Sequence, residues 1–325
     1  MTLVKKVTPQ IIKVPGPILQ STNTVLMVRP KKFRFNDQTA INNFYQTREA
    51  SDLHLHPEEN AMGEFDALVR ILRTNAIRVH VVETPEDLDI PDAVFPNNWI
   101  SFHEGGKYGL YSMFAPNRRL ERNVGLDATH FPLIAELREG FSFVSNEYEN
   151  RFLEGTGSLV LDRTNKIAYA AISERTDPGL AREFGKIMDY RVVLFRANQN
   201  VQGNRLPIYH TNVMMSIGSD FAWICDACID DDIERNQVLT TLGDSGREII
   251  RISEEQTAAF AGNILEVLNE KYEKFVVMST QAFQSLRDDQ IAALSRYAKI
   301  LHSDLTTIET LGGGSARCMI AEIFK

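Results

Sequence analysis

The sequence has few of the features that mark secreted, membrane or nucleic-acid-binding proteins. It contains 3 cysteines in 325 residues, too few for a disulfide framework, and its net charge of -8 offers no basic surface to nucleic acid. No apolar run approaches the roughly 18 residues that span a bilayer. Residues 1–17 carry no long apolar stretch before their prolines, which argues against a signal peptide. The sequence therefore predicts a cytoplasmic protein without nucleic-acid or membrane partners.

Motifs for metals and nucleotides are also missing. Cys225 and Cys228 form a C-D-A-C sequence within the apolar segment 221–229, but a zinc site needs two further ligands and no second pair exists. A redox pair normally opens a helix, whereas this segment is typical of a buried strand, so we interpret both cysteines as small core residues. The glycines at 312–314 lack the Lys-Ser/Thr of a phosphate-binding loop. The sequence thus predicts neither metal nor cofactor.

What the sequence does contain is a series of short apolar strands and amphipathic helices. Direct hairpins at 98–113 and 158–172 break strict strand–helix alternation, which disfavours a doubly wound sheet. No linker rich in Ser, Gly or Pro divides the chain. We therefore expect a lead-in at 1–24 and one α/β domain at 25–325, in which units of two strands, a helix and a strand recur. Strands are predicted at 25–30, 78–83, 98–103, 108–113, 158–163, 167–172, 191–196, 212–218, 221–229, 248–253, 274–279 and 317–324, and helices at 58–76, 129–138, 177–188, 231–242, 254–269 and 280–298.

One glycine-rich loop near the end of the chain has the composition of a reactive site. Residues 312–318 read G-G-G-S-A-R-C. Three consecutive glycines are costly to order, so such a loop usually exists because the backbone must approach something closely. Cys318 follows beside Arg317, near backbone N–H groups that can stabilise a thiolate or an oxyanion. The alternative is a flexible turn ahead of a core cysteine; we take Cys318 as the candidate nucleophile.

A thiolate nucleophile needs a proton carrier, and that carrier needs an orienting group. His210 is the candidate carrier because it lies at the entry to an apolar strand, where a polar side chain can face a cleft. Glu154 is the candidate orienting group, between a glycine-rich turn and an apolar strand. Taken singly, the histidine is better explained as a structural residue and the glutamate as a solvated charge. We interpret the other histidines as surface or edge residues: His54, His56, His80, His103, His130 and His302.

Several motifs together resemble those of the guanidine-modifying enzyme superfamily, which includes arginine deiminases, dimethylarginine hydrolases, amidinotransferases and citrulline-utilising relatives. G-G-G-S-A-R-C-M at 312–319 resembles the nucleophile motif, and L-E-G-T-G-S-L-V-L at 153–161 and H-T-N at 210–212 resemble the motifs of the acidic residue and the histidine. Three more segments resemble substrate-binding stretches of dimethylarginine hydrolases, namely 92–99, 115–121 and 173–176. The matches follow the family order along the chain.

The resemblance implies a five-bladed α/β propeller, or pentein, built of pseudo-repeated ββαβ units around a central active site. It implies that Cys318 is the nucleophile, His210 the general acid and base, and Glu154 the partner of the histidine.

The same matching implies a site for the amino-acid part of a substrate. Arg118 and Arg175 would hold the α-carboxylate, because a planar guanidinium binds a carboxylate through two hydrogen bonds. Asp92 would lie near the α-amino group. Arg119 remains an alternative to Arg118, since the sequence does not rank neighbouring residues.

The chain departs from the deiminase pattern where deiminases have aspartates. Asn98 and Asn212 occupy those positions. A guanidinium offers only donors and a positive charge, which carboxylates complement, whereas a ureido group is neutral and carries a carbonyl acceptor. Asparagine presents both a donor and an acceptor, so Asn97, Asn98 and Asn212 suit a ureido group. We therefore predict a hydrolase that cleaves L-citrulline to ornithine, carbon dioxide and ammonia through a covalent cysteine intermediate.

Three other functions remain open at the level of sequence. An arginine deiminase, arginine dihydrolase or dimethylarginine hydrolase is one, because asparagine can bind guanidinium through its carbonyl. An amidinotransferase would need an acceptor amine and exclusion of water. A non-catalytic pentein that acts as a binding protein is disfavoured by the joint presence of Cys318, His210 and Glu154. The expected partner is a small amino acid, and the sequence leaves a homodimer open.

Overall fold

One arrangement of three strands recurs through the molecule. The computed structural model describes residues 19–48, 55–125 and 135–324, and within them lie five three-stranded sheets and a two-stranded ribbon. In every three-stranded sheet the middle strand pairs antiparallel with one neighbour and parallel with the other. The sheets are β17 (Ala321–Glu322), β1 (Thr24–Arg29) and β2 (Arg78–Glu83); β3 (Ile100–His103), β4 (Lys107–Leu110) and β5 (Glu139–Ser142); β6 (Val160–Asp162), β7 (Ile167–Ala171) and β8 (Arg191–Phe195); β11 (Met215–Ile217), β12 (Phe221–Ile224) and β13 (Glu248–Arg251); and β14 (Leu265–Leu268), β15 (Lys274–Ser279) and β16 (Lys299–Ser303), with the ribbon β9 (Asn198–Val201) and β10 (Asn204–Pro207).

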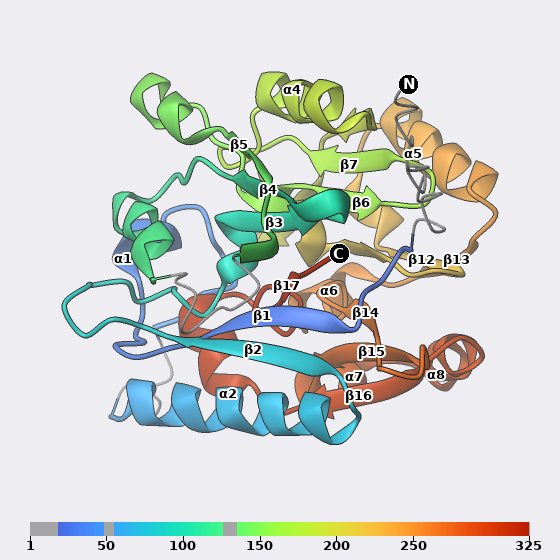
Figure 1. Ribbon diagram of the computed structural model, residues 1–325. Coiled ribbons are helices and arrows are strands. Elements are labelled where there is room, and N and C mark those ends of the chain that lie inside the picture. Colours follow the sequence, from blue (N-terminus) through green and yellow to red (C-terminus); the bar gives the residue numbers. More distant parts are fainter. Residues whose placement is uncertain (1–18, 49–54, 126–134, 325) are drawn as a thin grey trace, which may run out of the picture.

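In four of the five sheets α-helices join the parallel strands, as is usual for parallel connections, and they lie toward the outside; the described part of the connection between β4 and β5 contains a 3-10 helix, η4 (Pro116–Asn123). In Figure 1, α2 and α4 lie at opposite edges of the molecule, with β17 and β3 between them. α2 turns one face inward through Phe65, Leu68 and Leu72, whose spacing is that of an amphipathic helix. The connecting helices are α2 (Pro57–Thr74) between β1 and β2, α4 (Pro178–Met188) between β7 and β8, α5 (Asp232–Asp244) between β12 and β13, and α7 (Thr280–Ser285) with α8 (Asp288–Ser295) between β15 and β16.

Neighbouring sheets meet through the strands that run antiparallel to their middle strands. β17 contacts β3, β6 contacts β11, and β11 contacts β14. The first sheet is completed from both ends of the described chain, because β17 pairs with β1 through Val25 opposite Glu322 and Leu26 opposite Ala321. These strands therefore form the inner part of the molecule, and the residues at their entries are brought together.

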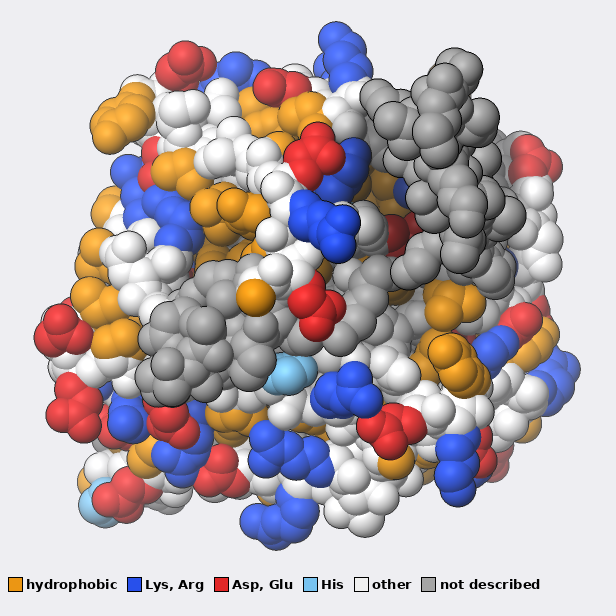
Figure 2. All heavy atoms as spheres, in the orientation of Figure 1, with side chains coloured by type: hydrophobic (Ala, Val, Ile, Leu, Met, Phe, Trp, Pro, Cys, Tyr) orange, Lys and Arg blue, Asp and Glu red, His pale blue; other side chains and the backbone are white. Residues whose placement is uncertain are grey.

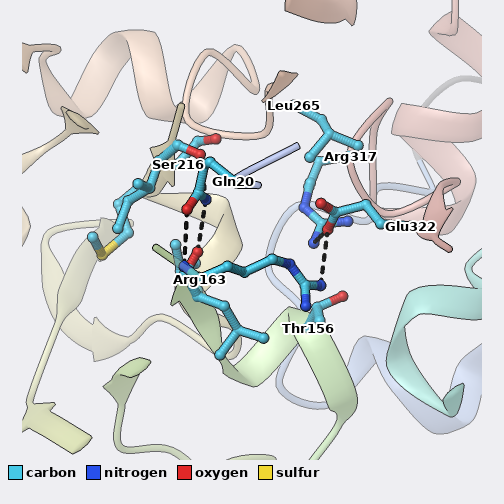
Figure 3. A pocket seen from close by; sticks show the side chains of 11 residues that line it. Gln20, Thr156, Arg163, Ser216, Leu265, Arg317 and Glu322 are labelled. Atoms are coloured by element: carbon cyan, nitrogen blue, oxygen red, sulfur yellow. Dashed lines mark hydrogen bonds and ion pairs between the residues drawn. The ribbon is translucent and has the colours of Figure 1, made fainter. Parts of the chain in front are cut away.

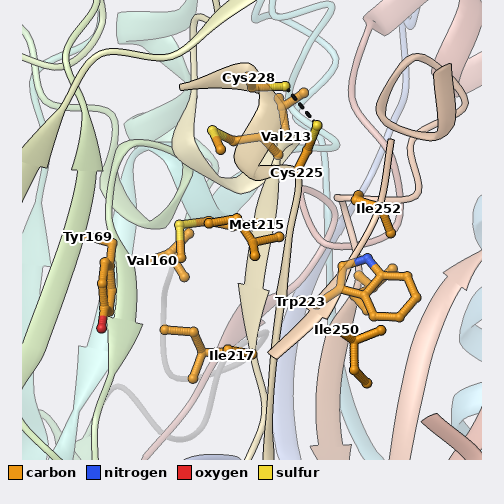
Figure 4. Packing of buried hydrophobic residues seen from close by; sticks show 14 of the residues in the cluster. Val160, Tyr169, Val213, Met215, Ile217, Trp223, Cys225, Cys228, Ile250 and Ile252 are labelled. Atoms are coloured by element: carbon orange, nitrogen blue, oxygen red, sulfur yellow. Dashed lines mark hydrogen bonds between the residues drawn. The ribbon is translucent and has the colours of Figure 1, made fainter. Parts of the chain in front are cut away.

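The largest apolar cluster lies around β11 and β12. Trp223 is fully buried and donates its indole N–H to the carbonyl oxygen of Ala261 at 2.7 Å. Figure 4 shows Trp223 beside Ile250 and Ile252, and the sulfur atoms of Cys225 and Cys228 facing each other. Those sulfur atoms are 3.1 Å apart and both residues are buried, which agrees with their interpretation as core residues.

Gln20 lies against two of the inner strands, β6 and β11. Its amide nitrogen donates to the carbonyl oxygens of Leu161 and Ile217 at 2.9 and 3.2 Å. Beside it, Arg317 and Arg163 converge on Glu322, at 2.9 and 3.7 Å (Figure 3). The cavity left between these side chains measures about 20 Å³, which is room for one water molecule. The rest of the predicted lead-in, residues 1–18, lies outside the described residues.

Several predicted elements are wrong in extent. Segment 254–269 is not one helix: α6 (Glu254–Ala258) ends before Phe260, which has a left-handed φ of 61°, and β14 follows. All four residues of β14 are buried and three of them are apolar, a pattern too short to distinguish a strand from a helix. Segment 280–298 is two helices, because Leu286 between them is extended. Segment 317–324 is mainly a turn that leads to the two-residue β17.

Other predicted elements differ from the structure at their ends, and some strands were not predicted at all. Segment 221–229 is a strand only to Ile224, and Cys228 lies in a 3-10 turn, η8 (Asp226–Cys228). β5, β9 and β10 were not predicted. The helix expected at 129–138 falls largely outside the described residues. No helix in the described parts of the chain is long and apolar enough to cross a membrane, and the face in Figure 2 carries charged side chains of both signs, intermingled.

Candidate active site

Six of the residues predicted for the site line one buried pocket. The free space between its side chains is small, about 10 Å³. Its lining includes Asp92, Asn98, Arg118, Arg175, His210 and Cys318, together with Thr39, Asn43, Phe95, Tyr209 and Gly312, Gly313 and Gly314. A larger hollow of about 540 Å³, beside Cys228 and Arg205, has none of the predicted site residues in its lining.

Short helical turns ahead of three inner strands place the polar residues. η2 (Pro96–Asn98) precedes β3, α3 (Gly155–Ser158) precedes β6, and η7 (Thr211–Val213) precedes β11. Glu154 is the residue before α3 and His210 the residue before η7, and α3 contacts both other turns. Residues distant in sequence therefore converge because equivalent positions of successive sheets face the same interior.

Glycine is required where these turns approach one another. A Cβ atom at Gly157 would overlap Nδ2 of Asn98 and lie 2.8 Å from Nδ1 of His210. The close approach explains the second glycine of the E-G-T-G sequence, and it shows that Nδ2 of Asn98 and Nδ1 of His210 both lie against Gly157.

His210 and Glu154 form a buried hydrogen-bonded pair. Nε2 of His210 lies 2.8 Å from Oε2 of Glu154, and each residue is at most 1% exposed. Burial lowers the pKa of His210 to about 4, although the hydrogen bond and charge of Glu154 oppose the shift. The neutral ring must carry its proton on Nε2, because a carboxylate only accepts. Nδ1 is then an unprotonated base, and it has no hydrogen-bond partner among the described residues.

Glu154 is held ionised by its surroundings. Burial alone would raise its pKa, but the charge of Arg175, the hydrogen bond to His210 and the charge of Arg118 lower the pKa to about 2. Oε2 lies 3.6 Å from Arg175 Nη1 and 3.8 Å from Arg118 Nη1. Oε1 accepts the backbone N–H of Phe114 at 2.9 Å. The carboxylate is thus already compensated within the protein.

Cys318 lies 3% exposed in the same pocket as His210. Its sulfur accepts hydrogen bonds from the side-chain amides of Asn263 at 3.2 Å and Asn212 at 3.5 Å. Its backbone N–H donates to the carbonyl oxygen of Ser315 at 2.9 Å. Asn263 was missed from the sequence, where A-G-N-I carries no motif that points to a nucleophile.

The two predicted arginines are both buried at the pocket, and each is already hydrogen-bonded. Arg118 donates to Glu121 from Nε at 2.7 Å and from Nη2 at 3.0 Å. Arg175 donates to Oδ1 of Asn42 from Nε at 2.9 Å and from Nη2 at 2.5 Å. Arg119 points elsewhere, because its guanidinium donates to the carbonyl oxygens of residues 113 and 114. Of the two adjacent arginines, Arg118 is therefore the one at the pocket.

Asp92 presents one oxygen atom to the pocket. Oδ2 accepts hydrogen bonds from Asn36 at 2.7 Å and from Thr39 at 3.2 Å, whereas Oδ1 has no partner among the described residues. Burial raises the pKa of Asp92, against the opposing charge of Arg118.

The three predicted asparagines differ in which side-chain atom is left without a hydrogen bond. Oδ1 of Asn98 accepts a hydrogen bond from Nη1 of Arg118 at 3.0 Å. Since an arginine can only donate, Nδ2 of Asn98 must face the other way, and within the described chain it has no acceptor. Asn212 uses its nitrogen for the sulfur of Cys318 and leaves Oδ1 unbonded. Asn97 is buried with both side-chain atoms unbonded, but it does not line the pocket.

A segment that the sequence did not single out covers the pocket. Residues 36–47 include α1 (Asp37–Ala40) and the turn after it. Asn43 donates to the carbonyl oxygens of Gly312 and Gly313 at 3.3 Å, and the ring of Tyr45 packs against Tyr209 at 6.1 Å. The polar composition of this segment resembles an ordinary surface loop, so nothing in the sequence indicated its contact with the glycine-rich loop. Among the described residues, no group of three or more His, Cys, Asp or Glu is placed to hold a metal ion.

Comparisons with known proteins agree with this arrangement. The family model described as N,N dimethylarginine dimethylhydrolase, eukaryotic, matches residues 29–325. Among solved structures, the fold is similar to ArgZ, an arginine dihydrolase of cyanobacteria, with a TM-score of 0.71, 16% identity and coverage of 93% of this chain and 40% of that one. AgrE gives a TM-score of 0.72 at 17% identity, with coverage of 93% and 39%. The chain thus spans well under half of both proteins, although it covers 98% of the separate N-terminal domain of ArgZ.

A shorter relative matches over its whole length. The dimethylarginine hydrolase DDAH of Pseudomonas aeruginosa, solved as a mutant in complex with citrulline, has a TM-score of 0.62 and 15% identity, with coverage of 93% of this chain and 99% of that one. No curated protein matches the chain in sequence. At such identities the structural likeness shows a shared α/β fold.

Proposed function

Since the chain belongs to the eukaryotic N,N dimethylarginine dimethylhydrolase family, whose hydrolases cleave non-peptide C–N bonds of guanidino groups, we propose that it hydrolyses the ureido group of L-citrulline. The products would be ornithine, carbon dioxide and ammonia. The proposal depends on the chemistry of the asparagines at the pocket, and it makes Cys318 the nucleophile, His210 the acid and base, and Glu154 the residue that orients the histidine.

The orientation of Asn98 is the observation that carries the proposal. Arg118 fixes the oxygen of this amide, so the free atom at the pocket is the donor Nδ2. A ureido carbonyl oxygen can accept that hydrogen bond, whereas a guanidinium has no acceptor to offer. A buried donor left without a partner costs about 1–3 kcal/mol. The neutral ureido group therefore satisfies an atom that a guanidinium would leave unpaired.

The charges around the pocket support the same choice. Glu154 is already paired with His210, Arg118 and Arg175, so it is not a free counter-ion for a guanidinium. Asp92 Oδ1 is suited to the α-amino group of the substrate. Arg118 and Arg175 supply positive charge near the α-carboxylate, and the contribution of Arg118 is mainly electrostatic because Glu121 occupies its guanidinium edge.

The reaction would proceed in two steps. Nδ1 of His210 takes the proton of the Cys318 thiol, the thiolate attacks the ureido carbon, and Asn98 Nδ2 donates to the oxygen as it gains negative charge. His210 then protonates the side-chain nitrogen of ornithine as its C–N bond breaks, which leaves a carbamoyl thioester on Cys318. A water molecule, deprotonated by His210, attacks the thioester, and the released carbamate gives carbon dioxide and ammonia.

We also propose that the five three-stranded sheets are the blades of a five-bladed α/β propeller, or pentein, within one domain at 25–325. The same antiparallel-then-parallel pairing in each sheet supports this architecture, as do the contacts between the inner strands of successive sheets. The position of the pocket at the entries of those strands is what a central active site requires.

An arginine dihydrolase is the second candidate. Oδ1 of Asn212 is an unbonded acceptor beside Cys318, and it could receive an N–H of a guanidinium. The cyanobacterial relative of known structure is named as such an enzyme.

Product analysis with a panel of L-citrulline, L-arginine, methylated arginines and agmatine separates the candidates. We expect ornithine and ammonia in equal amounts from citrulline, no turnover by Cys318→Ser, and labelling of the wild-type thiol by chloroacetamidine. Rapid consumption of arginine, with citrulline left untouched, would overturn the proposal. Absence of any turnover or labelling would instead favour a binding protein.

A further inference from the structure

Asn263 is held in place by the fold and lies next to the nucleophile. It is 1% exposed, in the turn between α6 and β14. The turn packs tightly against the neighbouring sheet, since a Cβ atom at Gly262 would overlap the carbonyl oxygen of Val213. The backbone beside Asn263 is therefore held against η7, the turn that precedes β11.

The side-chain amide of Asn263 makes four hydrogen bonds, two of them to Cys318. Oδ1 accepts the backbone N–H of Arg317 at 3.1 Å and that of Cys318 at 3.3 Å. Nδ2 donates to the backbone carbonyl oxygen of Asn212 at 3.0 Å and to the sulfur of Cys318 at 3.2 Å. The orientation is unambiguous, because two backbone donors require the oxygen and a carbonyl acceptor requires the nitrogen.

These bonds act on the thiolate in two ways. A hydrogen bond to the charged form of an acid favours ionisation, and this donor reaches a sulfur that is otherwise in a buried, poorly hydrated place. Holding the backbone N–H groups of residues 317 and 318 also fixes the direction of the sulfur relative to the pocket. An amide held by the scaffold thus stabilises and aims the thiol.

We propose that Asn263 is the positioning residue of the nucleophile, keeping Cys318 ionisable and directed into the pocket. The inference takes from the proposed function only that Cys318 is the reactive thiol, and it is independent of which substrate is bound. Aspartate at this position has the same shape and keeps the acceptor, but it replaces the donor with an oxygen that would repel both the thiolate and the Asn212 carbonyl.

The test is the pH dependence of alkylation of Cys318 in Asn263→Asp. Iodoacetamide reacts with the thiolate, so its rate against pH gives the apparent thiol pKa, and peptide mass spectrometry restricts the readout to residue 318. We expect the pKa to rise by at least one unit, which is about a tenfold loss of thiolate at pH values below it. With substrate, kcat should fall with little change in KM.

Asn269→Asp is the matched control, because it makes the same change in a buried asparagine at the other end of β14. Oδ1 of Asn269 also accepts two backbone N–H groups, those of Lys271 and Glu273, both at 2.9 Å. We expect the wild-type alkylation profile in this variant. If Asn263→Asp does not fold, Asn263→Ser, which cannot reach the sulfur with an amide donor, takes its place.

An unchanged alkylation profile in the folded Asn263 variant would overturn the inference. The result is separable from the proposed function: a shifted profile without citrulline turnover would keep the role of Asn263 and reject the substrate, whereas turnover with an unshifted profile would do the reverse.

Discussion

Replacing Asn98 by aspartate should change which substrate the pocket accepts. Arg118 lies 3.0 Å from Oδ1 and would hold the new carboxylate in the same place. The second oxygen would then stand where Nδ2 stands now, so a ureido carbonyl would meet an acceptor instead of a donor. Loss of a donor that stabilises a developing oxyanion costs roughly 2.7–4 kcal/mol, or about 10² to 10³ in kcat.

The same variant gains an acceptor for guanidinium N–H groups and a negative charge. We therefore expect kcat/KM for L-citrulline to fall by about 10² to 10³, while kcat/KM for L-arginine stays level or rises. The assay quantifies ornithine and ammonia from each substrate separately. Asn98→Ala should lose citrulline turnover without the gain for arginine, and Asn269→Asp should behave as wild type. If Asn98→Asp keeps citrulline activity within a few-fold of wild type, Nδ2 of Asn98 does not bind the ureido oxygen.

Three further results are expected. Glu154→Gln keeps the shape of the side chain but removes the charge that fixes the proton of His210 on Nε2. We expect kcat to fall by about 10² or more, the usual effect of losing general acid–base catalysis. A kcat near that of the wild type would show that the Glu154–His210 pair is structural. Gly157→Ala places a methyl group against Asn98 and His210 and should lower kcat/KM at least tenfold. Gly243→Ala, where a Cβ atom meets nothing within 4 Å, should keep the wild-type kcat/KM. Equal kcat/KM values for the two variants would refute the close approach at Gly157. Burial lowers the pKa of His210 from 6.5 to about 4, so the unfolded chain binds more protons between those values and the free energy of unfolding should fall by about 2 kcal/mol from pH 7 to pH 5. Urea midpoints that stay constant over this range in the wild type, or a pH dependence that persists undiminished in His210→Gln, would contradict this reasoning.

The sequence predicted the recurring pattern better than the exact elements. β2 and β15 have the predicted bounds, because each is a short valine-containing run that begins and ends at polar residues, which is typical of a strand. β14 was taken for the end of a helix, since four consecutive buried residues have no periodicity that distinguishes the two states. The short turns η2, α3 and η7, which carry the site, were not predicted as helical, and their last residues were assigned to the strands that follow because apolar residues come directly after them.

The residues of the site were predictable where a motif carried them. Cys318, His210 and Asn98 were identified and do share one pocket. Asn263 and the segment at 36–47 were not predicted, since their place in the site depends on contacts between parts of the chain distant in sequence and not on local composition. The hydrogen bonds that occupy Arg118 and fix the amide of Asn98 were also beyond the sequence, because each joins residues from different elements.

The pairing of β17 with β1 joins the surroundings of Cys318 to the completion of the first sheet. Cys318, the proposed nucleophile, stands three residues before β17, and the strand that completes the first sheet comes only after it. During synthesis, nearly all of the other strands can form while this stretch is still inside the ribosome. A chain truncated before Cys318 would therefore keep most of the strands but would lack both the proposed nucleophile and the strand that completes the first sheet.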